Sequence, residues 1–444
     1  KGWMQYEKII RKAAGMGEAS RNPDPDRYEK SHGFCDVLVV GSGPAGLMAA
    51  STAAAAGARV WLVDEQLHMG GQLNRETEVI EAMPALQWVK KTIESLAENP
   101  RVKLLSNSTV FGAYDGQTIG IVERCGAGEF KPQTRQRLWL LRTAQVVLAT
   151  GSIERPLVFG NNDRPGVMQA NAMRAYNNQY GVMCGHSSLV FTNNNSAYQT
   201  AFDLNNSGQK IAAVVDSRSA VDRGLVDKLA ELGIQHIVGS AVQDVKGKLK
   251  ISGAQLIDLK SSQKTGVIDC DCIAVSGGFS PNVQLHSMVG GKPRFDEAKL
   301  AFIPGDMPAG FHSAGACIAS FALQDCLQQG ALAGTAAAQG AGFSAVEHMV
   351  PIAGEHTLPM SEALWQVPKG KGKQFVDLQH DVAASDIELA HLEGYQSVEH
   401  LKRYTTLGMA GDQGRSSNLN ALALMARHRG DSISAVGTTT FRPP

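Results

Sequence analysis

The 444-residue sequence has no long apolar run, no excess of one charge and no disulfide-like spacing of its cysteines. No stretch approaches the ~20 apolar residues that a membrane-spanning helix needs, and no signal peptide opens the chain. Basic and acidic residues number 42 each, so the sequence lacks the basic excess that nucleic acids and anionic membranes demand. We therefore expect neither nucleic acid nor a membrane as a partner.

The seven cysteines include no Cys-x-x-Cys pair. An odd number of cysteines without disulfide-like spacing is typical of the reducing cytosol, which predicts a cytoplasmic protein. Cys270 and Cys272 form a Cys-x-Cys pair on a predicted strand, whose alternation would point both side chains the same way. We interpret them as core or edge thiols. Because the histidines lack paired ligand spacing, we predict no metal site.

Apolar runs alternate with helical stretches from Cys35 onward. Residues 36–40 are a predicted buried strand, residues 44–57 an Ala-rich helix and residues 58–63 a second strand. Such alternation predicts parallel sheets that are covered by helices on both faces. Further predicted elements are strands at 144–149, 188–191, 211–215, 271–276 and 311–315, and a helix near 197–207.

A glycine-rich loop follows the first strand and opens the helix after it. It reads Gly41-Ser42-Gly43-Pro44-Ala45-Gly46, which is the pattern of a dinucleotide-binding turn in the context that this turn requires. Gly41 permits the tight turn, Gly43 lets the backbone approach a diphosphate, and Gly46 lets helix and strand touch. The helix N-terminus offers free N–H groups and a partial positive charge to the phosphates.

An acidic residue closes the second strand, where an acid commonly accepts hydrogen bonds from a ribose. Asp64 is the first candidate and Glu65 the alternative, and an acid here disfavours NADP. A turn without any ligand is the competing interpretation, but strand, helix, acid and a second glycine turn together favour a binding site. Further cofactor-binding candidates are Gln66, Gly71, Gln72, Leu73, Thr150, Gly151 and Gly315.

These patterns predict an α/β fold with two Rossmann-type dinucleotide-binding domains, of the disulfide-reductase kind, and a small, mainly helical C-terminal segment. Two or three domains also agree with the length. The sequence begins at Lys1 rather than Met, and we expect it to be part of a longer polypeptide. The predicted segments are an N-terminal extension (1–33), the first domain (34–185), a degenerate second domain (186–290), a return to the first (291–368) and the C-terminal segment (369–444).

Two features of flavoproteins with this architecture are missing. Their late strand usually ends in Gly-Asp, whose carboxylate bonds the flavin's ribityl chain, whereas Ala316 follows Gly315 here. Alanine cannot accept that bond, which favours NAD over a fully bound FAD. The second unit carries asparagines at 193–195 in place of phosphate-loop glycines, so we interpret it as a scaffold and Asp216 as a cap or turn residue.

Several stretches resemble the α subunit of heterotetrameric sarcosine oxidase, and the resemblance covers nearly the whole chain. They are Trp3–Asp26, the Gly41 loop with Val63–Gln66, Thr192–Tyr198, Arg403–Met409, Asp412–Asn418 and Gly437–Pro444. In that family the α subunit also has an N-terminal ferredoxin-like domain and continues into an aminomethyltransferase domain.

The resemblance implies NAD in the site described above, FAD in a separate β subunit, and FMN at the α/β interface, covalently held by β. Sarcosine would be oxidised at the β-subunit FAD, with electrons passing through FMN to oxygen. The products would be glycine, hydrogen peroxide and a one-carbon unit for tetrahydrofolate, in a heterotetramer with β, γ and δ subunits. This chain would then hold no catalytic residue, and its NAD would be structural.

The same resemblance bears on an iron–sulfur cluster. Related α subunits of opine and amino-acid dehydrogenases bind a [2Fe–2S] cluster in the C-terminal segment through four cysteines. The matching positions here are Asp377, Gln379, Asp412 and Ser417, and none can supply a thiolate. The sequence therefore favours the oxidase branch over the dehydrogenase branch.

FMN requires donors for its phosphate and contacts for its ring. Residues 402–415 supply cations, hydroxyls and glycine turns within a short span. Alternatively, the two cations are only the charged end of an amphipathic helix, and the resemblance favours FMN contact. The candidates are Lys402, Arg403, Thr405, Thr406, Gln413 and Arg415.

Three functions remain open at this point. The first is the NAD-binding α subunit of a sarcosine or related secondary-amine oxidase, with the α subunit of an opine or amino-acid dehydrogenase as its near variant. The second is a self-contained FAD-dependent NAD(P)H oxidoreductase, which Ala316 and the asparagine loop disfavour. The third is a scaffold whose Rossmann loop binds nothing.

Overall fold

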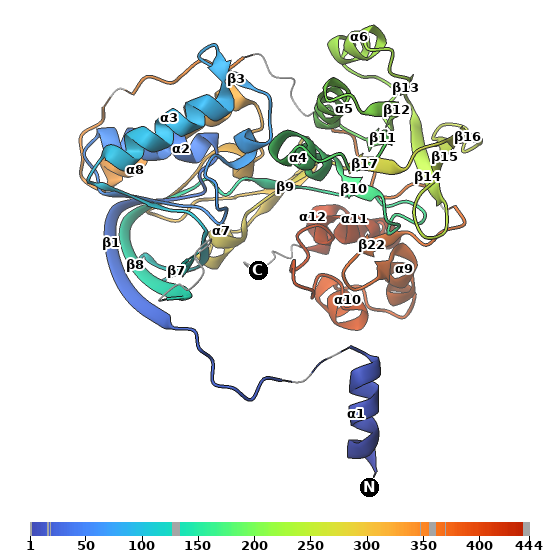
Figure 1. The fold of residues 1–444 in the computed structure, drawn as a ribbon, viewed down its shortest axis with the longest axis horizontal. Helices are drawn as coiled ribbons and strands as arrows, with labels where there is room; N and C mark the ends of the chain where they lie inside the picture. The colour runs from blue at the N-terminus through green and yellow to red at the C-terminus, as the bar shows by residue number, and fades with distance from the viewer. Residues whose placement is uncertain are drawn as a thin grey trace.

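The computed structural model describes residues 2–15, 17, 19–126, 134–346, 348–354, 361–368 and 370–437. They form two sheet-based domains, a small helical unit and a separate N-terminal helix (Figure 1). Residues 438–444, which belong to a stretch that carried the resemblance, and Lys369 of the predicted linker lie outside the described residues. Within the described ranges, no helix is long and apolar enough to cross a membrane.

The first domain is built on a seven-stranded sheet whose parallel part continues into an antiparallel meander. In order across the sheet, its strands are β5 (Val102–Leu105), β2 (Val60–Val63), β1 (Tyr28–Val40), β8 (Gln136–Leu148), β7 (Thr118–Arg124) and β6 (Ser108–Tyr114), with β21 (Phe311–Ser313) paired to β8. Its helical elements are α2 (Pro44–Ala55), η1 (Gly71–Asn74), α3 (Ala85–Glu98), α7 (Gln284–Met288), η2 (Gly315–Ile318) and α8 (Leu323–Gly340). Two short hairpins complete the domain, β3 (Val79–Ile80) with β4 (Met83–Pro84) and β19 (Arg294–Asp296) with β20 (Ala301–Ile303).

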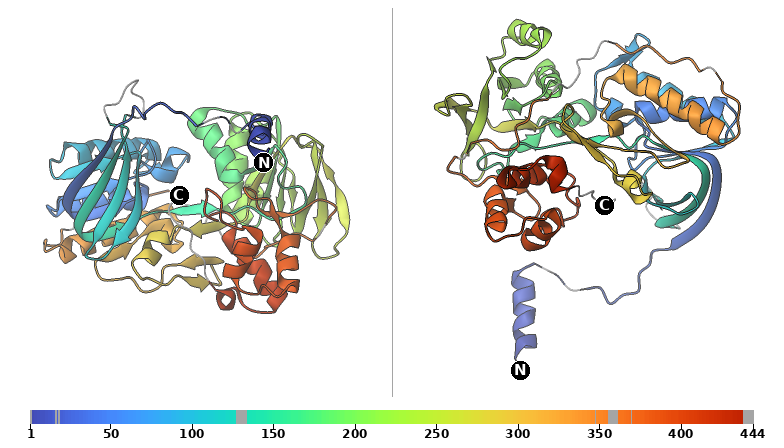
Figure 2. Two further views of the ribbon diagram at one scale, coloured as in Figure 1. Left: turned by 90° about the horizontal axis from the view of Figure 1, so that it is seen from below. Right: turned by 180° about the vertical axis from the view of Figure 1, so that it is seen from behind.

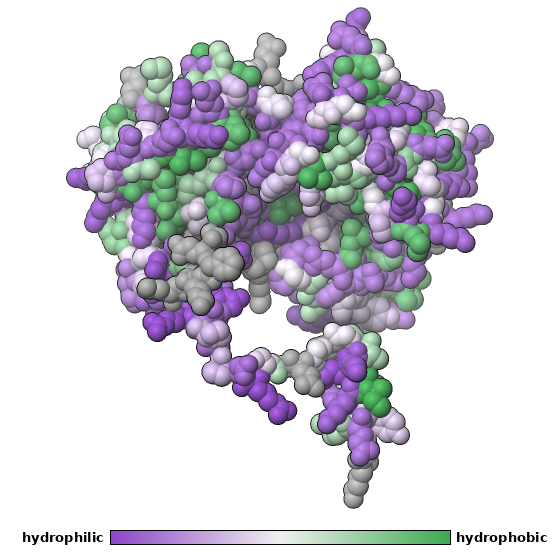
Figure 3. Space-filling model, in the orientation of Figure 1, coloured by the Kyte–Doolittle hydropathy of each residue, from purple (hydrophilic) through white to green (hydrophobic). Residues whose placement is uncertain are grey.

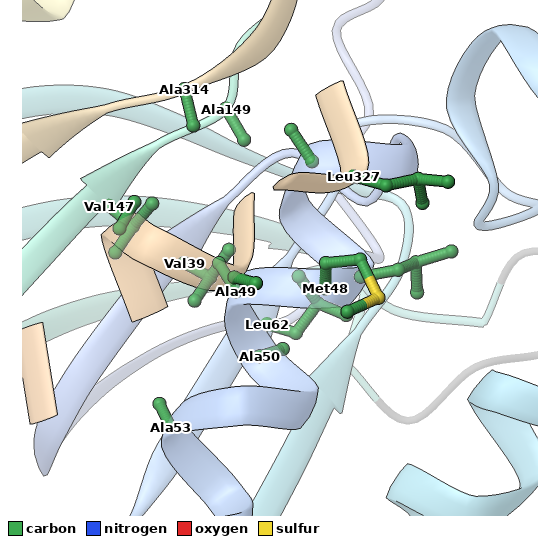
Figure 4. Close-up of a cluster of buried hydrophobic side chains, with 14 of the residues drawn as sticks. Val39, Met48, Ala49, Ala50, Ala53, Leu62, Val147, Ala149, Ala314 and Leu327 are labelled. Atoms are coloured by element: carbon green, nitrogen blue, oxygen red, sulfur yellow. The ribbon is translucent and has the colours of Figure 1, made fainter. Parts of the chain in front are cut away.

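Helices α2, α3 and α8 cover one face of this sheet (Figure 1). Small residues let α2 and α8 approach closely, because a Cβ on Gly330 would lie 2.2 Å from the Ala45 carbonyl oxygen and one on Gly334 2.5 Å from that of Ala49. Figure 4 shows Ala49, Ala50 and Leu327 in the apolar cluster that results. The Ala-rich composition of α2 thus positions the glycine loop at its N-terminus against the sheet.

Strand β1 is longer than the sequence predicted. It begins at Tyr28, inside the segment assigned to the N-terminal extension, and pairs in parallel with β8 from Tyr28↔Gln136 onward. Its first half is mostly exposed, so it lacks the continuous apolar pattern that identified residues 36–40. An ion pair of 2.9 Å between Glu29 and Arg137 ties this half to β8.

The second domain has a five-stranded parallel sheet and a three-stranded antiparallel sheet. The parallel strands are, in order, β10 (Val167–Gln169), β17 (Cys272–Ser276), β11 (Ser187–Thr192), β12 (Lys210–Asp216) and β13 (His236–Ile237). The other sheet consists of β14 (Ser240–Lys246), β15 (Gly253–Asp258) and β16 (Lys264–Ile268). The helices are α4 (Ala170–Tyr180), α5 (Ser196–Asn206) and α6 (Arg223–Glu231).

Two antiparallel strands connect the domains, β9 (Ser152–Glu154) and β18 (Phe279–Pro281). The predicted boundary near residue 185 is therefore too late, because β10 pairs with β17 of the second sheet and α4 packs on α5. The return likewise comes at β18 rather than near residue 290. Short segments such as β10 lack the length from which sequence periodicity could assign them to a domain.

The C-terminal unit lies beneath the second domain in Figures 1 and 2. It consists of β22 (Phe375–Asp377), β23 (Val382–Ala383), α9 (Ala384–Leu392), α10 (Val398–Thr405), α11 (Asn418–Arg429) and α12 (Ile433–Val436). Asn420 donates a hydrogen bond of 3.0 Å to the Pro156 carbonyl, which fastens the unit to the segment after β9. Helix α1 (Trp3–Ala13) stands apart from the rest and exposes apolar side chains (Figure 3).

Candidate functional site

The glycine loop between β1 and α2 packs closely against the chain at Gly41 and Gly46 and is open at Gly43. Gly41 has a φ of +98°, and a Cβ there would lie 2.3 Å from the Ala149 carbonyl oxygen. A Cβ on Gly46 would lie 1.8 Å from the Gly41 carbonyl oxygen, so the first turn of α2 packs directly against the loop at this residue. A Cβ on Gly43 would meet no described atom within 4 Å, so the loop presents its backbone to open space at this residue.

A cavity of about 680 Å³ lies in front of this loop. The first domain, the second domain and the C-terminal unit all contribute to its walls, and this volume is typical of small-molecule sites. Ser108, Thr109 and Val110 of β6 also line it, and the sequence had not indicated them. The predicted site residues on its walls are Gly41, Ser42, Gly43, Pro44, Ala45, Asp64, Glu65, Gln66, Gly71, Gln72, Leu73, Thr150, Gly151 and Arg415.

Asp64 is engaged within the chain. Its carboxylate accepts hydrogen bonds of 2.6 Å from both the backbone N–H and the hydroxyl of Ser42, and one of 2.8 Å from the Gln66 N–H. The Ser42 hydroxyl in turn accepts a bond of 3.1 Å from Gly70 N–H, which ties the second glycine turn to the first. Glu65, the alternative acid, is exposed and faces the cavity.

The late-strand position that carries an acid in related flavoproteins is at the cavity wall. Ala316 lines the cavity and supplies only a methyl group there. Gly315 has a φ of +77°, and its N–H donates a bond of 3.0 Å to the side chain of Gln329. Gly315 and Gly46 lie behind the residues that form the cavity surface, where their lack of a side chain allows close packing.

The opposite wall of the cavity comes from the second domain, and the sequence did not reveal it. Arg174 of α4 is 3% exposed and forms an ion pair of 2.5 Å with Asp203 of α5. Its other contact is Glu76 of the first domain, at 3.5 Å. Asp203 also accepts bonds from Thr77 and Asn178, so the segment after η1 is fastened to the second domain. No motif joins these distant positions, so only the fold identifies them.

The turn of the second unit holds asparagine side chains in place of glycines, and Asn195 and Ser196 at the start of α5 line the cavity. Asn194 donates to the carbonyl and hydroxyl of Ser276, so its side chain fills the turn after β11. Asp216 is fully buried, with Arg218 at 2.6 Å and the Tyr198 hydroxyl at 2.7 Å. Its carboxylate also accepts from the Arg218 N–H at 2.9 Å, as a turn residue does, but the buried ion pair goes beyond the cap or turn role that the sequence predicted.

The residues predicted to contact FMN do not share one surface of the cavity. Arg415 lines the cavity, whereas the other five lie outside it. Arg403 is 67% exposed and pairs with Glu399 one turn earlier at 3.2 Å, and Lys402 precedes it on α10. Thr405 and Thr406 bond to backbone carbonyls at the end of the same helix, and Gln413 bonds to the Ala410 carbonyl.

The positions that match cluster ligands lie in neighbouring turns of the C-terminal unit. Asp377 accepts bonds from the N–H groups of Gly408, Gln379 and His380. The side chain of Gln379 accepts from the Asp412 N–H at 3.3 Å. Hydrogen bonds to these side-chain oxygens thus join the turns. Within the described residues, no group of three or more His, Cys, Asp or Glu side chains could hold a metal ion.

The cysteines show no reactive pair among the described residues, where all seven are free thiols. Cys326 is the one on the cavity wall, and burial raises its pKa to about 12, so it stays protonated. Cys270 and Cys272 are buried thiols, as interpreted, but they belong to different apolar clusters rather than pointing the same way. The reason is that β17 begins only at Cys272, so strand alternation does not apply to Cys270.

Residues 35–297 match the pyridine nucleotide-disulphide oxidoreductase family, and they include the loop, the crossing strands, the second domain and a large part of the first. The chain belongs to this family. Residues 371–444 separately match the sarcosine oxidase A3 domain, which covers the C-terminal unit. The predicted two-domain Rossmann architecture with a small helical C-terminal segment is thereby confirmed.

Among curated proteins, sarcosine oxidase subunit alpha of Rhizobium meliloti (strain 1021) is 44% identical over 99% of this chain. The alignment covers 44% of that relative, so the chain spans less than half of its length. The chain is thus a homologue of the α subunit of sarcosine oxidase, an oxidoreductase, as the resemblance indicated.

Solved structures share the fold of this pyridine nucleotide-disulphide oxidoreductase homologue. L-proline dehydrogenase from P. horikoshii superposes with a TM-score of 0.72 at 20% identity, over 96% of this chain and 80% of the other. Thioredoxin reductase from T. acidophilum does so with a TM-score of 0.53 at 17% identity, over 69% of this chain and 98% of the other.

Proposed function

We propose that this chain is the NAD-binding part of the α subunit of a multisubunit, flavin-dependent sarcosine oxidase. The observation that carries the proposal is the cavity in front of Gly43, which combines an open phosphate cradle with a methyl group at Ala316. The 44% identity to a sarcosine oxidase α subunit supports the choice of enzyme.

The walls of the cavity fit a dinucleotide without a 2′-phosphate. The N-terminus of α2 directs backbone N–H groups and a partial positive charge at the place where Gly43 leaves room for a diphosphate. Glu65 is the acid that we assign to the adenosine ribose, because the oxygens of Asp64 already bond to Ser42 and Gln66. The Glu65 carboxylate would repel a 2′-phosphate, although Arg415 on the same wall offsets part of that charge, and on this balance we infer NAD rather than NADP.

We assign this NAD a structural role. NAD supplies hydride chemistry where a donor or acceptor lies beside its nicotinamide, and the described walls hold neither a redox pair nor an activated thiol. Cys326 remains a protonated thiol, so it offers no nucleophile to the ring. This chain's residues would therefore bind and orient the nucleotide, and none of them is proposed as catalytic.

The proposal places amine oxidation in a partner β subunit that holds FAD, with FMN at the α/β interface and oxygen as the final acceptor. Sarcosine would yield glycine, hydrogen peroxide and a one-carbon unit for tetrahydrofolate, in a cytoplasmic assembly that also has γ and δ subunits. For the FMN contact we keep Lys402, Arg403, Thr405, Thr406 and Gln413. Arg415 we reassign to the dinucleotide cavity, because it lies on that wall.

The test is to denature the purified full-length complex and identify the released cofactors by mass. We expect NAD to be released in equal amount to this chain together with one FAD, whereas the FMN should stay covalently attached to β and be found with that subunit. A second FAD in place of NAD would instead indicate that this chain is an FAD-dependent oxidoreductase. Release of no nucleotide beyond the partner's flavins would contradict the proposal and leave a scaffold.

A further inference from the structure

Arg415 brings a positive charge from the C-terminal unit to the cavity wall. It lies in the turn between α10 and α11 and is partly exposed, so a ligand in the cavity can reach it. The glycine loop belongs to the first domain, which means that the cavity joins this loop to a cation from a distant part of the chain.

Hydrogen bonds within the turn fix the backbone of Arg415. The Asp412 carboxylate accepts a bond of 3.0 Å from the Gly414 N–H and one of 2.8 Å from the Ser416 hydroxyl. The Arg415 N–H donates a bond of 3.1 Å to the Asp412 carbonyl. Asn420, on the helix that follows, is bonded to the segment after β9, so the turn has a fixed place relative to the two sheet-based domains.

Glu65 faces the same cavity from the end of β2. Its neighbour Asp64 bonds to Ser42 at 2.6 Å, which holds the end of this strand beside the glycine loop. In a Rossmann unit that holds a diphosphate at this loop, the acid after the second strand meets the adenosine ribose. Glu65 is exposed, so its carboxylate is available to that ribose.

The charges of Glu65 and Arg415 act on each other. Burial lowers the pKa of the Arg415 guanidinium, and attraction to the carboxylates of Glu65 and Asp412 opposes this lowering. Asp412 belongs to the turn that carries Arg415, whereas Glu65 belongs to the first domain. The adenosine end of the cavity therefore contains a carboxylate and a guanidinium that come from different parts of the chain.

A ribose 2′-hydroxyl and a 2′-phosphate require opposite partners. A carboxylate accepts a hydrogen bond from the hydroxyl but repels the phosphate. A guanidinium binds phosphate through two parallel N–H···O bonds. A site with both groups selects the hydroxyl while its carboxylate is charged, and it already contains the cation that a phosphate requires.

We propose that Glu65 and Arg415 together set the choice between NAD and NADP, and that Arg415 binds the 2′-phosphate of NADP when residue 65 carries no charge. This inference rests on the proposed function, which assigns the diphosphate to α2 and the adenosine ribose to Glu65. The C-terminal unit then takes part in selecting the nucleotide that the first domain holds.

The experiment measures dissociation constants for NAD and NADP by calorimetry, on the full-length complex after its nucleotide has been removed. Glu65→Gln should bind NADP about tenfold or more tightly than wild type does, because the repulsion is gone. Adding Arg415→Met to this variant should weaken NADP binding about tenfold or more, as for the loss of a bond from a charged donor. The affinity for NAD should stay nearly unchanged on adding Arg415→Met.

Arg429→Met in the same Glu65→Gln protein is the matched control. Arg429 is also a partly exposed arginine of the C-terminal unit, but it pairs with Asp431 at 2.7 Å and does not line the cavity. It should leave both affinities unchanged. Unchanged NADP binding on adding Arg415→Met, or an equal effect of Arg429→Met, would overturn the proposal. Equal weakening of NAD and NADP by Arg415→Met would also overturn it and would assign Arg415 to the diphosphate.

Two further measurements cover the case in which the double variant with Arg415→Met does not fold. Arg415→Gln keeps a polar side chain without the charge, and the same selective loss of NADP is expected from it. In Glu65→Gln alone, added salt should weaken NADP binding more than NAD binding, since the extra contact joins two opposite charges. Equal salt dependence would overturn the proposal. If wild type binds neither nucleotide, the proposed function itself fails, which is a separate result.

Discussion

Gly43 and Gly46 belong to the same glycine motif, but Gly43 precedes α2 whereas Gly46 lies in its first turn. A side chain on Gly43 would enter the cavity, whereas one on Gly46 would collide with the Gly41 carbonyl. We expect Gly43→Leu to lower the NAD content of the purified protein at least tenfold, and to change the free energy of unfolding of the nucleotide-free protein by no more than about 0.5 kcal/mol. Gly46→Ala should destabilise the fold by about 1–3 kcal/mol through overpacking.

Nucleotide content by mass and unfolding by denaturant distinguish these two effects. Unchanged NAD content in Gly43→Leu would remove the basis for placing a diphosphate at this loop. Equal losses of stability in both variants would mean that Gly43 is also a packing position, contrary to the open space in front of it.

The side chain at position 316 is the basis of a second prediction, which concerns flavin retention. Ala316 reaches the cavity surface but offers no acceptor, whereas an aspartate there could accept a hydrogen bond from a ribityl hydroxyl. Ala316→Asp should therefore increase the FAD retained by this chain, measured as flavin released on denaturation. Ala316→Asn is the control for size, and a gain that requires the carboxylate should be larger for aspartate. Flavin content equal to wild type would show that the missing acid does not decide between the cofactors.

For single residues, the sequence predicted the glycine loop but not which of the two acids after β2 is bonded within the chain. Position made Asp64 the first candidate and Glu65 the alternative, and only the bonds from Ser42 and Gln66 show that Asp64 is engaged. Arg174 could not be found at all, because its partner Asp203 and the glycine loop are far from it in sequence. Such contacts depend on how two domains meet, which no local pattern encodes.

Among the elements, the packing of α2 on α8 predicts where the first domain tolerates larger side chains least. Gly330 faces α2, with the Ala45 carbonyl 2.2 Å from where its Cβ would lie, whereas Leu332 of the same helix is 72% exposed. Gly330→Val should lower the free energy of unfolding by about 1–3 kcal/mol, since the helices must separate. Leu332→Ala should change it by about 0.5 kcal/mol or less. Denaturant titration checks both, and similar values for the two would contradict the close helix contact.

Strand β9 carries a buried acid that predicts a pH dependence. Burial raises the pKa of Glu154 to about 7 from 4.5, against the lowering effect of its bonds, one of them from Asn171 N–H at 2.8 Å. The folded state therefore holds this proton more tightly than the unfolded state, so the stabilising contribution is lost as pH rises from about 4.5 to 7. Between pH 5 and 8 the wild type should lose on the order of 2 kcal/mol more than Glu154→Gln. Parallel stability curves for the two proteins would refute the assignment.

Element prediction succeeded where apolar runs were continuous and failed where they were not. The strands that became β2, β11, β12 and β17 were found within one or two residues, because buried parallel strands are apolar throughout. The exposed half of β1 and the first half of β8 were missed, since each has solvent on part of its surface. The short strand β10 was assigned to the wrong domain for a different reason, because its pairing with β17 is a long-range contact that no local pattern shows.

For the whole molecule, three separate parts of the chain meet at one cavity. The first domain supplies the glycine loop, the second supplies Arg174, and the C-terminal unit supplies Arg415. The sequence had grouped Arg415 with Lys402 and Arg403 because they are close along the chain, but the fold turns Arg415 towards the cavity instead. A ligand that touches all three parts would stabilise their arrangement.

This arrangement predicts that nucleotide binding is visible in global stability. A ligand that binds only the folded chain at 100 times its dissociation constant adds about 2.7 kcal/mol to the free energy of unfolding. NAD should therefore raise the melting temperature of the nucleotide-free protein, and NADP at the same concentration should raise it far less because its 2′-phosphate meets Glu65. Glu65→Gln removes that repulsion, so the melting temperatures measured with NAD and with NADP should become more similar. Equal stabilisation of the wild type by NAD and NADP would show that Glu65 does not contact the ribose, and that the adenosine lies elsewhere in the cavity.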